Sequence, residues 1–148
     1  MPTHAPPVLR PAQRAQIAND LRLACMRISR RVRYEGAGSL APHQFSVLAR
    51  IDEQPRTPGE LADLERVSAP SMTRTVASLV AGGWVDRTPD AQDRRQVNLT
   101  LTPEGRQLLT DTRRRRDAWM AVRLAGLSDD EVRLLRDASA ILARIAAE

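Results

Sequence analysis

Residues 68–81 place apolar residues and small polar residues at the spacing of one helix. Ser68 is a good N-cap for a helix from Ala69 to about Ala81. At 100° per residue, one side of this helix is apolar, formed by Met72, Val76 and Leu79. The opposite side is small and polar: Pro70, Ser71, Arg74, Ala77 and Ser78, with Thr73 on the flank. A helix that enters a groove ~12 Å wide needs slim residues, so we expect contacts to bases in duplex DNA. An ordinary surface helix is the alternative.

Residues that could support catalysis or bind a metal ion are scarce. The chain has two histidines, His4 and His43, and a single cysteine, Cys25. These do not provide a Cys–His pair, a Ser–His–Asp triad or a cysteine zinc site, and no glycine-rich phosphate loop occurs. We therefore expect no enzyme, no cofactor and no metal. A single cysteine also excludes an internal disulfide, which fits a reducing cytoplasm.

The charge of the chain indicates a polyanionic partner without identifying it. The 148 residues have a formal net charge of +5, and all 23 basic residues are arginines. Arginine suits bidentate contacts to phosphate and guanine, although codon bias in a GC-rich genome explains the excess equally well. Aromatic residues make up 3% of the chain, too few for the base-stacking platforms of single-strand binders. Between Arg56 and Thr100 six arginines match six acids, so DNA binding must depend on where charges lie.

The middle of the chain, residues 40–101, has the pattern of a helix-turn-helix followed by a hairpin. A helix is expected from Pro42 to about Asp52, and Thr57 to Glu60 form a capping box for a brief second helix. The helix that begins after Ser68 completes the helix-turn-helix. Strands are expected at 84–87 and 96–101, joined by a charged turn. This hairpin is termed the wing.

Long helices flank this module, after a loose tail at residues 1–11. One helix is expected over 12–36, and two more over 102–148, the second after a capping box at Ser128. The predicted apolar stripe of the first is Ile17, Leu21, Cys25, Ile28 and Val32. The helix that begins at residue 102 has the predicted apolar stripe Leu108, Thr112, Trp119 and Val122. The last helix has the predicted apolar stripe Val132, Leu135, Ala138, Leu142 and Ile145. These stripes are longer than the small module can cover, so we expect a two-fold homodimer that pairs them. The fold class is therefore mainly α with a small wing and long dimerisation helices.

Several segments in order give the chain a resemblance to the MarR family of winged helix-turn-helix regulators. They are Leu40–Phe45, Thr57–Ala62, Val67–Arg74, Leu79–Arg87, Asp90–Arg95 and Leu99–Gly105. The resemblance covers roughly residues 12–146. It implies a dimer on pseudo-palindromic operator DNA, usually a repressor, and often one released by a small ligand or oxidant. For this chain the expected effector is a small aromatic or anionic ligand.

Candidate roles follow for the individual residues. Ser68 caps the helix; Ser71, Thr73, Arg74 and Ser78 are expected on the DNA side, with Arg74 on a guanine. Arg94, at the wing tip, is expected to reach the minor groove or phosphates, and Asp93 to orient a neighbouring arginine. Arg87 and Arg95 are expected to contact phosphates or stabilise the wing, the alternative for Arg87 being an ion pair with Asp86 or Asp90.

Other features favour plain structural explanations. Some members of the resembled family sense peroxides through a cysteine on the first helix, but Cys25 lies mid-stripe and is expected to be buried. His43 is expected where the helix over 12–36 meets the short helix that begins at Pro42. A cationic cleft formed with Arg27 or Arg31 is an alternative there to a plain helix-start residue. No stretch approaches the ~18–20 apolar residues of a membrane span, so no membrane partner is expected. A protein-interaction module without DNA binding is the main rival function.

Overall fold

The computed structural model describes residues 8–35, 40–91, 93 and 95–147. Its elements are α1 (Pro11–Glu35), α2 (Pro42–Glu53), α3 (Pro58–Glu65), α4 (Ala69–Ala81), β1 (Val85–Pro89), β2 (Val97–Leu101), α5 (Pro103–Leu124) and α6 (Asp129–Ala146). The mainly α fold with a two-stranded wing is therefore confirmed. Most of the predicted tail, residues 1–7, lies outside the described residues.

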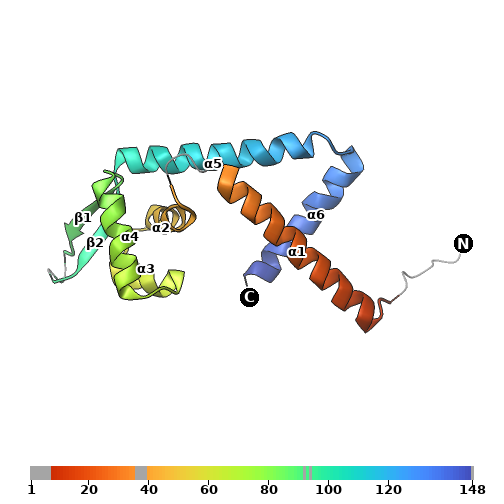
Figure 1. The fold of residues 1–148 in the computed structure, drawn as a ribbon, viewed down its shortest axis with the longest axis horizontal. Helices are drawn as coiled ribbons and strands as arrows, with labels where there is room; N and C mark the ends of the chain where they lie inside the picture. The colour runs from red at the N-terminus through yellow and green to blue at the C-terminus, as the bar shows by residue number, and fades with distance from the viewer. Residues whose placement is uncertain (1–7, 36–39, 92, 94, 148) are drawn as a thin grey trace, which may run out of the picture.

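The elements form two groups joined by α5. Figure 1 shows α5 as a long bar, with α2, α3, α4 and the hairpin gathered at its N-terminal end. α6 begins beyond the other end of α5 and runs back beneath it, whereas α1 meets α5 near its middle and extends away from the hairpin. α1 packs against α5, whereas α2, α3, α4 and the two strands pack on one another. α5 thus connects a compact group to two long helices.

The main hydrophobic core lies within the compact group and the first turns of α5. Its buried side chains come from α2, α3, α4, both strands and the first turns of α5, together with Leu40. The largest fully buried ones are Leu48, Leu61, Met72, Leu79, Leu99 and Leu109. Each helix of the group buries one side only, as its apolar spacing predicts. The opposite sides remain available for other contacts.

The wing is a short antiparallel ladder with a third segment on its inner edge. Val85 pairs with Leu101 and Pro89 with Val97. On the other side of β2, the Leu99 N–H donates to the Arg56 carbonyl at 2.8 Å, and the Arg56 N–H returns a bond of 3.3 Å. This exchange ties the wing to the loop between α2 and α3, next to the helix-turn-helix.

The first turn of α5 fits tightly against the end of the α4–β1 connection. The Thr102 hydroxyl donates to the Gly83 carbonyl at 2.7 Å and accepts from the Gly105 N–H at 2.9 Å. A Cβ added at Gly105 would lie 2.0 Å from the Trp84 carbonyl oxygen, which is backbone and cannot rotate away. Glycine at 105 therefore permits the approach that fixes α5 on the module.

The long helices differ from their predicted burial. Among the residues whose burial is described, α1 and α6 contain no buried residue in the single chain. The prediction that Cys25 is buried is wrong here, because its side chain is exposed on α1. On α5, Thr112 and Trp119 are buried as predicted, but Leu109 rather than Leu108 enters the core and Val122 is 71% exposed. α5 leaves the core after its first turns, so none of the described residues covers Val122. No described helix is apolar enough over a sufficient length to cross a membrane.

The contact at Gly105 predicts a strong effect of a single methyl group. We expect Gly105→Ala to destabilise the fold by about 1–3 kcal/mol, because backbone must shift to admit the Cβ. Gly59→Ala is the matched control, since its added Cβ would meet only the Thr57 hydroxyl at 3.9 Å and it lies in a helix. Urea unfolding followed by circular dichroism measures both. Equal stability of the two variants would contradict the assignment.

Candidate nucleic-acid interface

The turn between α3 and α4 sets the angle of the helix-turn-helix. Thr57 and Glu60 form the predicted capping box at the start of α3, with the Glu60 carboxylate accepting from the Thr57 N–H at 2.8 Å. At the end of α3, Arg66 adopts a left-handed conformation with φ 53°, and the Val67 N–H donates to the Ala62 carbonyl. Such a turn closes one helix within a few residues and starts the next.

α4 begins and ends as the sequence predicts. The Ser68 hydroxyl accepts from the Ser71 N–H at 3.4 Å, and the helix ends at Gly82. Met72, Val76 and Leu79 are buried, so the predicted inward side is confirmed. The orientation of the opposite side follows from this burial, because the helix is rigid.

The outward side of α4 presents one cation among small residues. Arg74 is exposed and forms no ion pair with any described residue. Thr73 is exposed, and its hydroxyl donates to the Ala69 carbonyl at 2.9 Å. Ser71 is only half-buried toward α2, so it lies less far outward than its helical angle predicts. A slim surface with one arginine fits a major groove.

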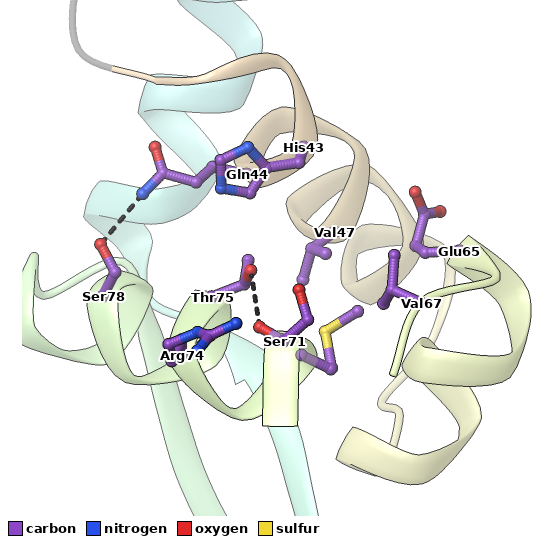
Figure 2. Close-up of a pocket in the computed structure, with 10 residues that line it drawn as sticks. His43, Gln44, Val47, Glu65, Val67, Ser71, Arg74, Thr75 and Ser78 are labelled. Carbon is purple, nitrogen blue, oxygen red and sulfur yellow. Dashed lines mark hydrogen bonds between the residues drawn. The ribbon is translucent and has the colours of Figure 1, made fainter. Parts of the chain in front are cut away.

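A hollow of about 440 Å³ separates the start of α2 from α4, and the sequence analysis did not predict it. Figure 2 shows its polar rim: His43 and Gln44 on α2, and Ser71, Arg74, Thr75 and Ser78 on α4. The Gln44 side-chain amide donates to the Ser78 hydroxyl at 3.0 Å. His43 is therefore beside α4, and the cleft considered between His43 and Arg27 or Arg31 is not formed. Those arginines line a separate hollow on α1.

The packing of α2 on α3 depends on a shared carboxylate. Glu65 accepts from the Ser46 hydroxyl at 2.6 Å and from Arg50 Nε at 3.2 Å. The side chain of Glu65 is 18% exposed, and its charge is balanced by Arg50. This acid therefore adds little negative potential to the adjacent outward side of α4.

In the wing, acidic side chains organise the turn that precedes β2. Asp90 accepts from the Asp93 N–H at 2.9 Å and from the Asn98 amide at 2.8 Å. Asp93 accepts from the Arg95 N–H at 3.0 Å and lies 3.4 Å from Arg95 Nε. Arg95 is 92% exposed at its side chain.

The other two wing arginines differ from Arg95. Arg87 is exposed on β1 and makes no ion pair within the described residues. Arg94 lies outside the described residues.

A second, more apolar cavity of about 640 Å³ lies between α1, α5 and α6. Its apolar lining includes Ile28 and Val32 of α1 and Leu135 of α6, and Arg33 and Arg116 line it as well. The Arg116 guanidinium stacks on the Phe45 ring at 3.6 Å, and its Nε has no partner among the described residues. Burial lowers the pKa of Arg116, and the neighbouring charge of Arg33 lowers it further.

No cluster of metal ligands occurs in the described part of the chain.

Comparison with known proteins gives consistent matches. Residues 39–96 match the family model described as MarR family. An uncharacterized HTH-type transcriptional regulator of Mycobacterium bovis is 43% identical over 130 residues, which is 86% of this chain and 91% of that protein. Among solved structures, a putative transcriptional regulator of Pseudomonas aeruginosa is 31% identical with a TM-score of 0.80, covering 90% of this chain and 96% of that one.

The same fold occurs in a structure bound to DNA. A MepR variant of S. aureus, solved with an oligodeoxyribonucleotide, has a TM-score of 0.68 at 17% identity, covering 87% of this chain and 97% of that one. At this identity the match concerns the fold alone. The helix-turn-helix, the wing and the similarity along most of the chain together describe a regulator rather than an enzyme. The chain belongs to the MarR family of DNA-binding winged helix-turn-helix transcriptional regulators.

Proposed function

We propose that this protein is a homodimeric repressor that binds a pseudo-palindromic operator in duplex DNA. The exposed, slim side of α4 with Arg74 at its centre is the observation that supports this most directly. Residues 40–101 form the DNA-binding module, and residues 12–36 and 102–148 supply the dimerisation helices. A two-fold dimer presents two copies of α4 to half-sites about one helical turn, ~34–36 Å, apart. Such a regulator acts where a bacterial chromosome lies, in the cytoplasm.

Each candidate residue has a place in this proposal. Arg74 donates to a guanine edge, while Thr73, whose hydroxyl proton is already used within the helix, offers its methyl group to thymine. Ser68, Ser71 and Ser78 lie along the same helix and contact the nearby backbone or bases. Arg87 and Arg95 contact phosphates, Asp93 orients Arg95, and Arg94 reaches the minor groove from the wing tip.

The homodimer is supported by the apolar residues that this chain leaves uncovered. On α6, Ile141 and Ile145 are 51% and 57% exposed, and on α1 Ile17 is 52% exposed. Large apolar side chains in rows on two long helices indicate an interface, because their burial stabilises association. A second copy supplies matching rows by symmetry.

Release by a small anionic aromatic ligand is the third part of the proposal. The cavity between α1, α5 and α6 has apolar walls that suit an aromatic ring. Arg116, with an unpartnered Nε and a like charge beside it, suits a carboxylate. Because α5 joins this cavity to the DNA-binding module, a ligand there shifts the spacing of the two α4 helices in the dimer.

A charge on the uncovered side of α6 tests the dimer. We expect Ile141→Glu to give monomers and to weaken operator binding at least about tenfold, because a buried carboxylate opposes association. Ala140→Glu places the same group on another side of α6 and should leave the dimer intact. Sedimentation velocity measures the oligomeric state. A wild-type protein that sediments as a monomer contradicts the proposal.

Substitutions of two arginines separate base contacts from phosphate contacts. We expect Arg74→Ala to lower discrimination against the wrong base by about 1–3 kcal/mol at one position of each half-site. We expect Arg95→Ala to weaken all sequences alike and to reduce the slope of log K against log salt by about 1 per subunit. The operator is first selected from random duplexes, and gel shifts over a salt series give both quantities.

These measurements also test DNA binding itself. Binding through phosphates weakens steeply as salt rises. Wild-type affinity that does not depend on salt for any duplex would favour a protein-interaction module instead.

Benzoate serves as a probe for the ligand site. We expect millimolar benzoate to release the wild-type protein from its operator, and Arg116→Met to raise the required concentration about tenfold, the value of one charge-assisted hydrogen bond. Arg114→Met is the control, because Arg114 is exposed on α5 beside Asp111 and does not line the cavity. Fluorescence anisotropy of labelled operator measures release. Equal responses of both variants would contradict a role for Arg116.

A further inference from the structure

The hydroxyl groups of α4 differ in how their protons are used. Thr73 donates to the Ala69 carbonyl at 2.9 Å, and Thr75 donates to the Ser71 carbonyl at 3.2 Å. Both protons are therefore used within the helix. Ser78 is exposed, one turn beyond Arg74 on α4. Among the described residues its hydroxyl makes one hydrogen bond, which the oxygen accepts from the Gln44 side-chain amide at 3.0 Å.

The direction of the Gln44–Ser78 bond is fixed by the other end of Gln44. Gln44 Oε1 accepts from the Ala41 backbone N–H at 2.9 Å, at the start of α2. A backbone N–H can only donate, so the carbonyl side of the amide must face Ala41. The amide nitrogen of Gln44 then faces Ser78, as Figure 2 shows, and the Ser78 oxygen must accept.

This direction leaves the Ser78 proton pointing away from Gln44. A hydroxyl has one proton and two lone pairs, so accepting from an amide N–H keeps the proton available for a further acceptor. The rim of the hollow near Ser78 is formed by the side chains of Arg74, Thr75 and His43. None of these three is a carboxylate that would accept the Ser78 proton. Glu65 lies at the other end of the hollow, bound to Ser46 and Arg50.

We propose that Gln44 is a positioning residue for DNA recognition, which holds Ser78 so that its hydroxyl donates a hydrogen bond to an oxygen or nitrogen acceptor of the operator. The inference rests on the DNA-binding function proposed above and adds a residue of α2 to it. The acceptor is a phosphate oxygen or a base edge such as guanine O6 or N7. Because Gln44 also caps α2, it ties the orientation of this donor to the start of that helix.

Two substitutions change this hydrogen bond without removing the helix cap. Ser78→Ala removes the donor and keeps a good helix former in α4. Gln44→Glu keeps an oxygen for the Ala41 N–H, but a carboxylate can only accept, so it draws the Ser78 proton inward and turns a lone pair outward. Gln13→Glu is the matched control, because Gln13 Oε1 likewise accepts a backbone N–H, from Arg10 at the start of α1.

The experiment measures affinity of the full-length wild type, both single variants, the double variant and the control for the selected operator and for random duplex. We expect Ser78→Ala to weaken operator binding about fivefold, the value of one neutral hydrogen bond. Gln44→Glu should weaken it at least about tenfold, because it replaces an attraction with a repulsion. The double variant should bind no more weakly than Ser78→Ala alone, and Gln13→Glu should bind like the wild type.

The double variant separates this mechanism from the added charge. If Gln44→Glu acted by repelling phosphates, its loss would persist without the Ser78 hydroxyl, and the inference would be overturned. Thermal unfolding of both single variants should match the wild type, since a loss of fold would also lower affinity. A loss confined to the operator assigns a base edge, and an equal loss on random duplex assigns a phosphate.

Two further results are decisive. If the wild type binds DNA while Ser78→Ala and Gln44→Glu bind within about twofold of it, Gln44 does not position a donor. If the wild type binds no duplex, the proposed function itself is wrong and this inference falls with it.

Discussion

The burial of one side of α4 determines the whole candidate interface. Met72, Val76 and Leu79 fill the space between α2, α3 and the wing, and no other rotation of α4 would bury all three. This packing fixes which residues face outward, since a helix of 13 residues turns as one body. The core thus sets the orientation of Arg74 although Arg74 takes no part in it. Fixed side-chain geometry of this kind is what direct base contacts require.

The segment from Arg56 to Thr100 has equal numbers of basic and acidic residues, but the structure distributes their charges unevenly in space. Several of its acids are bound within the protein: Glu60 in a helix cap, Glu65 by Ser46 and Arg50, and Asp93 by Arg95. Arg74 and Arg87, in contrast, form no ion pair with the described residues. Acids occupied by internal partners repel phosphate less, so a segment of zero net charge can still present cations to a polyanion.

The two ends of α5 serve different purposes in this arrangement. Its first turn is held against Trp84 by Thr102 and by the space that Gly105 leaves. Its far half contributes to an open cavity with α1 and α6, two helices with no buried side chain among the residues whose burial is described. A rigid helix fixed at one end and loosely packed at the other can transmit a change in packing over its length. This makes α5 the structural link between ligand, dimer and DNA in the proposed function.

The sequence by itself determined the features that depend on neighbours along the chain. Local hydrogen bonding and helical spacing account for the caps at Thr57, Ser68 and Ser128. They also account for the limits of the helices within a few residues and for the inward side of α4. The tertiary structure decided contacts between distant segments. Gln44 meets Ser78 across 34 residues, and Leu109 rather than Leu108 enters the core, because one residue turns the side chain by 100° and only packing selects the angle. It also placed His43 beside α4 and left Cys25 exposed, since burial depends on which surfaces meet and not on the pattern of one helix.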